Sequence, residues 1–206
     1  DCDLAPHMSR ITAQIRGRRL DYHLPLPGRH LVINSLGLLA TVDALGADVA
    51  RAAASLARLA ALDGRGRRHV VHAGAGDFTV IDESYNSNPA SIRAAAATLA
   101  NMQPDGGGRR VVVLGDMREL GAASAAEHAN LAPVLKAAAI ELVFTTGTEM
   151  AHLWNALPAA MQGGHADHAD ALAPMVAAAA RPGDVFTVKG SLAGGLRAVV
   201  DALLAR

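Results

Sequence analysis

Four polar side chains with different chemistry lie within a stretch of seven residues, at Asp82, Tyr85, Asn86 and Asn88. A carboxylate at the end of a strand can accept hydrogen bonds from both hydroxyls of a ribose, although it can equally cap its own loop. The Tyr85 ring can lie against a base or against a neighbouring domain. Asn88 can cap a helix, bind a ligand, or do both. The types and spacing of these residues therefore indicate a ligand-binding segment.

Residues 78–100 supply the elements that must position these side chains. Residues 78–81 form a short, β-prone apolar run behind a glycine-rich turn, which predicts a buried strand. Pro89 suits the first position of a helix, and the alanines at 94–97 favour its continuation. Open α/β sheets bind ligands beyond the carboxyl ends of their strands. A strand, a polar loop and a helix N-terminus in this order therefore predict a ligand-binding edge.

The rest of the chain divides into two parts of different pattern. Before residue 28 the short alternating runs are typical of a hairpin or a sheet edge, and helices are predicted at 32–45 and after Asp48. Later residues alternate, with strands predicted at 111–114, 141–147 and 184–188, a weaker one at 164–168, and helices at 127–139, 149–156, 170–180 and 196–204. This alternation predicts an α/β, Rossmann-like domain with a mostly parallel sheet. We place it at 77–206, after a first segment at 1–76, with a glycine-rich hinge at 74–77.

Composition excludes several classes of protein. Of 206 residues, 51% are hydrophobic and 18% charged, which is enough for one or two domains with real cores. Nineteen Lys and Arg balance 19 Asp and Glu, so no global field favours nucleic acid or an anionic membrane. No apolar run approaches the roughly 20 residues of a membrane helix. The single cysteine, Cys2, leaves no internal disulfide and fits a reducing, cytoplasmic location.

The beginning of the chain, DCDLAPHMSR, has neither an initiator Met nor a signal-peptide pattern. We interpret it as a cut end and expect the chain to be a fragment of a longer protein.

Three segments carry a family resemblance. DESYNSNPASIRAA, at 82–95, resembles the DDSYNANPxSMxAA signature that opens the C-terminal domain of the Mur ligases. LGDMRELG at 114–121 is similar to the family's LGDMxELG, and VKGS at 188–191 to its strand-end KGS. The branch resembled adds D-alanyl-D-alanine to UDP-N-acetylmuramoyl-tripeptide. The resemblance implies ATP-dependent amide-bond formation through an acyl phosphate, with Mg²⁺, in peptidoglycan synthesis and hence in cell shape and division.

The resemblance also implies a site for ATP. The family ends its central ATPase domain with a GxHNxxN segment, which Gly28, His30 and Asn34 match, while Leu31 replaces the first Asn. Leucine cannot imitate an amide that reads an adenine edge. Arg65 matches the arginine beside the ATP phosphates, where its planar fork suits phosphate oxygens. The implied ATP-binding residues are His30, Asn34, Arg65, Asp82, Tyr85 and Asn86. Taken alone, the first two would be an ordinary helix start, and Arg65 a solvated basic turn.

The substrates are implied to face a second set of residues. These are Asn88, Asp116, His128, Lys189 and Ser191. A lysine and an oriented turn at a strand end can hold a substrate carboxylate. A lone histidine on a helix is usually a surface or core residue, so we assign no catalytic base. Residues 193–196 depart from the family's Gly-Ser-Arg-Met turn, which removes an arginine contact.

Several motifs are missing from the sequence. No G-x-x-x-x-G-K-S/T phosphate loop occurs, so 1–76 would correspond to the end of the central ATPase domain and 77–206 to the C-terminal domain. We expect such a fragment to be inactive alone, and its first segment could be covered by a second copy of the chain. The GHADHAD segment at 164–170 has no accompanying metal motif, and we interpret it as a solvated loop and strand edge rather than a metal site.

Two other functions remain open. A related ligase, such as another amino-acid-adding member or a folylpolyglutamate synthetase, is disfavoured because those enzymes lack SYNxNP. A non-catalytic, degenerate Rossmann-like binding domain is the alternative from another class, and Leu31 and the 193–196 turn favour it. A phosphate loop encoded upstream of Asp1 would discriminate between them.

Overall fold

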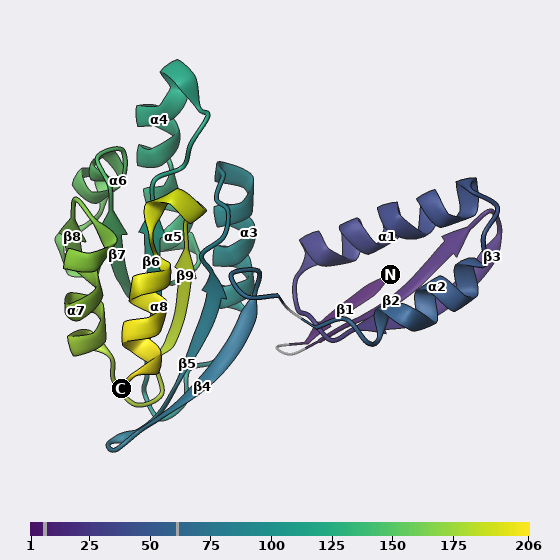
Figure 1. The fold of residues 1–206 in the computed structure, drawn as a ribbon, viewed down its shortest axis with the longest axis horizontal. Helices are drawn as coiled ribbons and strands as arrows, with labels where there is room; N and C mark the ends of the chain where they lie inside the picture. The colour runs from purple at the N-terminus through teal and green to yellow at the C-terminus, as the bar shows by residue number, and fades with distance from the viewer. Residues whose placement is uncertain (6–7, 61) are drawn as a thin grey trace. The chain divides into compact units, whose positions relative to one another are not determined.

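The computed structural model describes residues 1–5, 8–60 and 62–206, and the chain forms two compact units, 1–61 and 62–206 (Figure 1). The first unit has a three-stranded antiparallel sheet in the order β1-β2-β3, with β1 at Cys2–Ala5, β2 at Met8–Ile15 and β3 at Arg18–Leu24. Arg16 and Gly17 both have positive φ, which the two-residue turn of the β2–β3 hairpin requires. The expected hairpin is therefore present.

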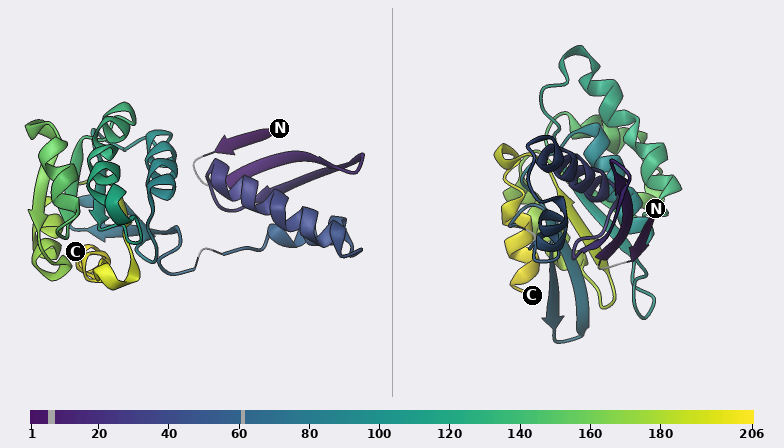
Figure 2. Two further views of the ribbon diagram at one scale, coloured as in Figure 1. Left: turned by 90° about the horizontal axis from the view of Figure 1, so that it is seen from above. Right: turned by 90° about the vertical axis from the view of Figure 1, so that its right-hand side faces the viewer.

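Two helices, α1 (Arg29–Ala44) and α2 (Val49–Leu56), cover one face of this sheet (Figure 2). Alternate residues of β2 and β3, including Ile11, Tyr22 and Leu24, pack against Leu39 and Leu56 of the helices. The Asp48 side chain accepts a hydrogen bond of 3.0 Å from the Arg51 N–H and so caps α2, as the sequence predicts.

The second unit is built on a six-stranded sheet in the order β4-β5-β9-β6-β7-β8. Its strands are β4 (Arg67–Ala73), β5 (Gly76–Glu83), β6 (Arg110–Gly115), β7 (Leu142–Thr146), β8 (Gln162–Ala166) and β9 (Val185–Lys189). Only β4 and β5 pair antiparallel, and all other neighbours are parallel. The predicted α/β class with a mostly parallel sheet is confirmed.

Helices cover both faces of this sheet. One face carries α3 (Pro89–Ala100), α4 (Ser124–Ala129), α5 (Leu131–Ala137) and α6 (Met150–Ala156), and the other carries α7 (Ala169–Ala179) and α8 (Arg197–Leu204) (Figure 1). Three short 3₁₀ turns lie at Gly121–Ala123, Ala159–Met161 and Leu192–Gly194. Because both faces are covered, β6 carries no charged residue after Arg110, and Val111 and Val113 are fully buried.

Strand β4 changes the division of the chain. It pairs with β5 from Arg67 opposite Asp82 to Ala73 opposite Gly76. The boundary between the two units therefore falls between residues 61 and 62, earlier in the chain than the expected boundary between 76 and 77. The expectation of a hinge at 74–77 is also wrong. These residues form the turn of the β4–β5 hairpin and the start of β5, which lie within one unit.

The expected single helix at 127–139 is two helices, α4 and α5, that meet at Asn130. Pro133 explains the break. It has no N–H to donate to the carbonyl of Ala129, so a continuous helix through this point would lose a hydrogen bond and meet the proline ring.

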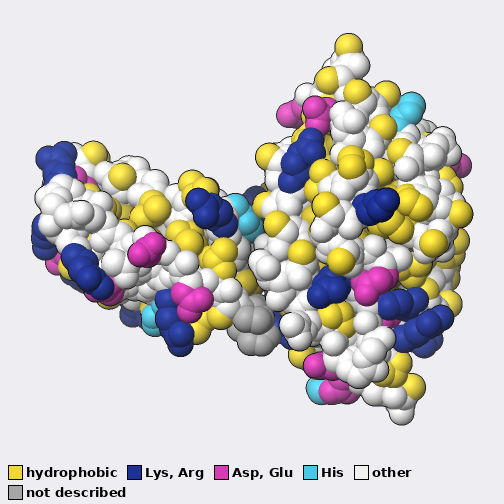
Figure 3. All heavy atoms as spheres, turned by 180° about the vertical axis from the view of Figure 1, so that it is seen from behind, with side chains coloured by type: hydrophobic (Ala, Val, Ile, Leu, Met, Phe, Trp, Pro, Cys, Tyr) yellow, Lys and Arg dark blue, Asp and Glu magenta, His cyan; other side chains and the backbone are white. Residues whose placement is uncertain are grey.

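No helix in the described part of the chain is long and apolar enough to cross a membrane. On the face of the molecule shown in Figure 3, acidic and basic side chains are interspersed, as the balanced composition predicts.

Candidate functional site

The carboxyl ends of β5 and β9 form a topological switch point. The two strands are parallel neighbours, and Glu83 at the end of β5 is in register with Lys189 at the end of β9. The chain leaves β5 into α3 on one face of the sheet and leaves β9 into α8 on the other. Loops that diverge in this way leave a crevice between them, which is where open α/β sheets bind ligands.

Asp82, one residue before the end of β5, is completely buried, with 0% of its surface exposed. Its Oδ1 accepts hydrogen bonds from the Ser84 N–H at 3.0 Å and from the Ser84 hydroxyl at 2.6 Å. Its Oδ2 accepts from the Gly64 N–H at 3.0 Å and lies 3.7 Å from Nη1 of Arg197. The backbone carbonyl of Asp82 accepts from the Gly66 N–H at 2.7 Å. Both carboxylate oxygens are therefore engaged with the protein.

Arg65 and Tyr85 form an exposed pair, and each follows a residue, Gly64 or Ser84, that hydrogen-bonds to Asp82. The guanidinium carbon of Arg65 lies 4.1 Å from the centre of the Tyr85 ring, within the range of a cation–π contact. The Tyr85 N–H donates to the Gly64 carbonyl at 3.2 Å, which brings the two backbone segments together. Gly64 has a φ of +72°, and an added Cβ would lie 3.0 Å from the Cβ of Tyr85, so a side chain there would be strained and would crowd Tyr85. The pair presents a flat, positively charged surface.

Lys189 ties together the loops that follow β5 and β9. Its ammonium is 2.9 Å from the carboxylate of Glu83 and donates at 2.9 Å to the carbonyl of Asn86. Lys189 is only 5% exposed, and a buried charge needs such partners. The Leu192 N–H donates to the Tyr85 carbonyl at 2.9 Å and adds a second link.

Two hydroxyls in these loops have no hydrogen-bond partner among the described residues. They belong to Ser87 and Ser191, and both residues are buried. Buried polar atoms are rarely unpaired in folded proteins, so these two hydroxyls can hydrogen-bond to a ligand or a water.

A second cluster braces the loop after β6. Oδ1 of Asp116 accepts from the Met150 N–H at 2.8 Å, at the start of α6. His128 is completely buried, and its Nε2 accepts from the Met117 N–H at 3.0 Å. Its Nδ1 lies 2.8 Å from the carbonyl oxygen of Ser124, which can only accept, so the ring proton is on Nδ1. His128 therefore holds this loop and exposes no surface to a substrate.

Asn88 caps α3. Its side chain accepts from the Ser91 N–H at 2.8 Å, and the Ser91 hydroxyl accepts from the Asn88 N–H at 3.0 Å. This is a capping box with Pro89 at the first helical position, as the sequence predicts.

The other two expected residues, His30 and Asn34, belong to the first unit. They lie four residues apart on α1, and so on one side of that helix. Between them, Leu31 is partly buried against the core of that unit. An apolar side chain at this position thus contributes to packing.

The structure brings together Arg65, Asp82, Tyr85, Asn86, Lys189 and Ser191, and separately Asp116 and His128. Sequence reasoning missed Gly64, Ser84 and Glu83 as members of the first group. The signals for them were available: Glu83 and Ser84 lie inside the DESYNSNP segment, and Gly64 begins the GRGR turn.

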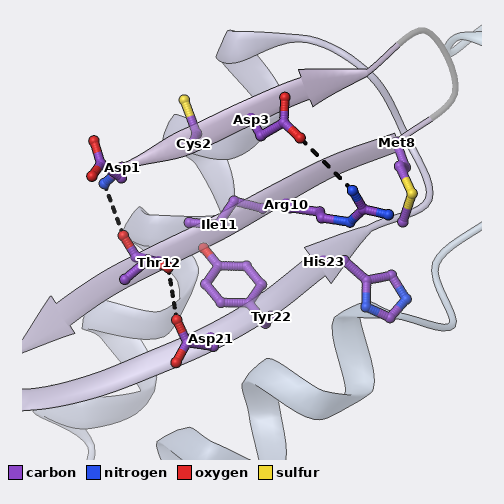
Figure 4. A pocket seen from close by; sticks show the side chains of 10 residues that line it. All are labelled: Asp1, Cys2, Asp3, Met8, Arg10, Ile11, Thr12, Asp21, Tyr22 and His23. Atoms are coloured by element: carbon purple, nitrogen blue, oxygen red, sulfur yellow. Dashed lines mark hydrogen bonds and ion pairs between the residues drawn. The ribbon is translucent and has the colours of Figure 1, made fainter.

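A hollow in the first unit lies along its strands and contains none of the expected residues (Figure 4). Its polar side chains pair with one another: Arg10 with Asp3 at 3.8 Å, and the Thr12 hydroxyl with Asp21 at 2.7 Å. Hydrogen bonds from Arg19 and Thr12 hold the pKa of Asp21 below its usual value.

The histidine-rich segment at 164–170 is not a loop throughout. His165 lies on β8, where its Nδ1 is 2.8 Å from the Thr145 hydroxyl and its ring stacks on Trp154 at 5.9 Å between ring centres. The strand expected at 164–168 is therefore present two residues earlier, at 162–166, and residues 167–168 form a bend before α7. Within the described ranges, no three His, Cys, Asp or Glu residues are grouped so as to hold a metal ion.

Comparison with known proteins places these features in a family. Residues 66–192 match the family described as "Mur ligase, glutamate ligase domain". The chain is 35% identical over 215 residues to the UDP-N-acetylmuramoyl-tripeptide–D-alanyl-D-alanine ligase of Mycobacterium bovis, covering 95% of this chain and 42% of that protein. The chain thus spans about two fifths of the length of this curated relative.

Two solved structures show the same fold. A crystal structure of MurF from Acinetobacter baumannii superposes with a TM-score of 0.82 at 23% identity, covering all of this chain and 44% of that one. MurF ligase from Thermotoga maritima, in complex with ADP, superposes with a TM-score of 0.77 at 20% identity, covering all of this chain and 45% of that one. Since the family match extends over more than half of the chain and the fold agrees, this chain belongs to the Mur ligase family.

Proposed function

We propose that this chain is part of an ATP-dependent ligase that adds D-alanyl-D-alanine to UDP-N-acetylmuramoyl-tripeptide in cytoplasmic peptidoglycan synthesis. The relative from M. bovis carries this activity in its name. The observation that carries the proposal is the exposed Arg65–Tyr85 pair, which follows residues that hydrogen-bond to the buried Asp82 at the carboxyl end of β5. We also propose that 1–61 is the end of a central ATPase domain.

The nucleotide fits this pair chemically. A guanidinium can donate two parallel hydrogen bonds to phosphate oxygens, and an aromatic ring can pack against a base or sugar. Asn86 is exposed next to them and can read a polar edge. The T. maritima relative was crystallised with ADP, which supports a nucleotide at this fold. Magnesium usually binds substrate phosphates through one or two carboxylates and several waters, and we propose that those carboxylates lie mostly outside this chain. His30 and Asn34 remain proposed ATP contacts.

The acceptor side of the site is the Lys189 loop. Lysine has three N–H donors, and Glu83 and the Asn86 carbonyl occupy two of the three on Lys189. The third donor and the unpaired Ser191 hydroxyl can receive a substrate carboxylate. Asp116 and the loop after β6 would face the incoming peptide. Asn88 and His128 support this surface from beneath, and we propose no direct substrate contact for His128.

The reaction then has two displacements. The tripeptide carboxylate attacks the γ-phosphorus of ATP, the bond to the bridging oxygen breaks, and ADP leaves. The free amine of D-alanyl-D-alanine attacks the acyl carbon of the resulting acyl phosphate, loses a proton, and displaces inorganic phosphate. Phosphoryl transfer of this kind depends mainly on positioning and on stabilisation of charge, which is the role that Arg65 would serve.

The test is a phosphate-release assay on the intact ligase, with ATP, the UDP-tripeptide and D-alanyl-D-alanine. Arg65→Ala removes the phosphate fork and half of the exposed pair, so we expect KM for ATP to rise about tenfold or more, since one charge-assisted contact corresponds to about 1.5–3 kcal/mol. Arg206→Ala, at an exposed arginine in the last position, is the matched control and should leave KM unchanged. An unchanged KM for Arg65→Ala would remove the nucleotide from this site.

A non-catalytic nucleotide-binding domain is the second candidate. Leu31 in place of an adenine-reading amide and the exposed Leu192 before the 193–196 turn favour it. In that case the intact protein would bind ATP in a titration but release no phosphate with all three substrates present. We propose the ligase because the Lys189 loop and the loop after β6 are both assembled. The same experiments can record whether 1–61 associates with a second copy.

A further inference from the structure

Asp82 is closed off from a ligand by its burial and by its own hydrogen bonds. Its Oδ1 receives the Ser84 N–H and hydroxyl at 3.0 and 2.6 Å, and its Oδ2 receives the Gly64 N–H at 3.0 Å and faces Arg197. The residue is 0% exposed. A ribose could reach this carboxylate only by displacing one of these donors, and both Gly64 and Ser84 are buried, so the displaced group would be left unpaired.

The same contacts hold the backbone on both sides of the exposed pair. Gly64 and Gly66 flank Arg65, and Asp82 binds both of their N–H groups, one through its carboxylate and the other through its carbonyl, at 3.0 and 2.7 Å. Ser84 immediately precedes Tyr85, and Asp82 binds it twice. Asp82 thus links the backbone that carries the guanidinium to the backbone that carries the ring.

We propose that Asp82 is a positioning residue that presents Arg65 and Tyr85 to the nucleotide, and that it makes no contact with the ribose. This inference rests on the proposed nucleotide site. The phosphate and the base or sugar contact Arg65 and Tyr85, while the Asp82 carboxylate fixes the position of Arg65 relative to Tyr85. Without the Asp82 carboxylate the Gly64 N–H loses its acceptor, and the guanidinium is held less firmly over the ring, from which it lies 4.1 Å.

The first experiment measures Kd of the intact ligase for ATP, 2′-deoxy-ATP and 3′-deoxy-ATP. In Asp82→Asn the amide nitrogen cannot accept, so it turns a donor toward either Gly64 or Ser84. A positioning role predicts that Kd rises by the same factor, about tenfold, for all three nucleotides. A ribose contact predicts that Kd rises for ATP but not for at least one deoxy analogue, which already lacks the hydroxyl that Asp82 would bind. The second pattern would overturn the proposal.

Ser84→Ala gives a prediction of opposite sign for the two roles. It removes the 2.6 Å hydrogen bond to Oδ1 and leaves the carboxylate intact with more free acceptor capacity. If Asp82 binds the ribose, this variant binds ATP as well as the wild type or better. If Asp82 acts through the pair, the variant binds ATP about threefold more weakly, because Tyr85 is less firmly held. This variant keeps the question open to test even if Asp82→Asn does not fold.

Combining variants separates failure of this inference from failure of the proposed site. If Asp82 acts through Arg65, then adding Asp82→Asn to the Arg65→Ala variant raises Kd for ATP by less than about twofold. Full additivity would overturn the positioning role while leaving the nucleotide site in place. If instead Arg65→Ala alone has no effect, the nucleotide site itself is wrong. Asp201→Asn, at an exposed carboxylate that also binds Arg197, is the control and should match the wild type.

Discussion

At the scale of single residues, buried polar side chains hold the loops of this edge in place. His128 receives the Met117 N–H and donates to the Ser124 carbonyl, so one imidazole joins the loop after β6 to α4. Asp116, in the same loop, receives the first N–H of α6. A loop held at both of these points presents its remaining side chains in one geometry, which a substrate-binding surface requires.

Replacing His128 by Ala should cost about 2–4 kcal/mol of unfolding free energy. The change leaves a buried N–H without its acceptor, a carbonyl without its donor, and a cavity of ring size. Urea unfolding of the 206-residue chain, followed by circular dichroism, measures this. His152→Ala, at an exposed histidine on α6, is the matched control, and it should change stability by less than about 0.5 kcal/mol. Equal stability of the two variants would show that His128 does not brace the loop.

Residue types were predictable here, but their partners were not. Asp82, Asn88 and Lys189 stand out in the sequence because each lies at the end of a predicted element. Asn88 finds its partner three residues along at Ser91, and its capping role was correctly predicted. Asp82 binds Ser84 nearby, but it also binds Gly64, 18 residues earlier, and Lys189 binds Asn86, 103 residues earlier. Such contacts depend on strand order, which no local pattern encodes.

At the scale of elements, α3 positions the loop after β5, and its cap can be tested. Asn88→Ala should lower the unfolding free energy by about 1 kcal/mol, because the Ser91 N–H loses its acceptor. Asn88→Asp should retain stability, since a carboxylate caps equally well and favours a helix N-terminus. If Asn88→Asp keeps stability but lowers kcat/KM of the intact ligase, Asn88 also binds substrate. Unchanged stability in Asn88→Ala would contradict the capping role.

The sequence pattern located β5 to β9 and α3, α6, α7 and α8 to within a few residues, and all of these except β8 are continuous apolar or amphipathic runs. It did not find β4. The sequence RRHVVHA has two adjacent valines among four charged or imidazole side chains and no regular alternation, and the strand lies at the edge of the sheet with Val70 half-exposed. Edge strands commonly carry such charges, which weakens their hydrophobic signal.

At the scale of the whole molecule, β4 determines which part of the chain is an independent folding unit. Residues 62–206 contain the entire six-stranded sheet, both helical layers and the Gly64 turn that Asp82 binds. In a chain that begins at 77 instead, β5 would become the edge strand, paired only with β9. Phe78 and Val80, which are 3% and 0% exposed in the structure, would then become more exposed.

We therefore expect residues 62–206 to unfold cooperatively and to be more stable than 77–206 by more than about 3 kcal/mol, from lost apolar burial and lost partners of Asp82. Urea unfolding of both chains measures the difference, and hydrogen exchange of the β5 amides locates it. A chain that begins at 66 measures the contribution of the Gly64 turn, because it keeps β4 but lacks the Gly64 N–H that Asp82 binds. Its unfolding free energy should lie between those of the other two chains. If 77–206 proves as stable as 62–206, β4 is an accessory strand and the boundary belongs at 76, as the change in sequence pattern suggests.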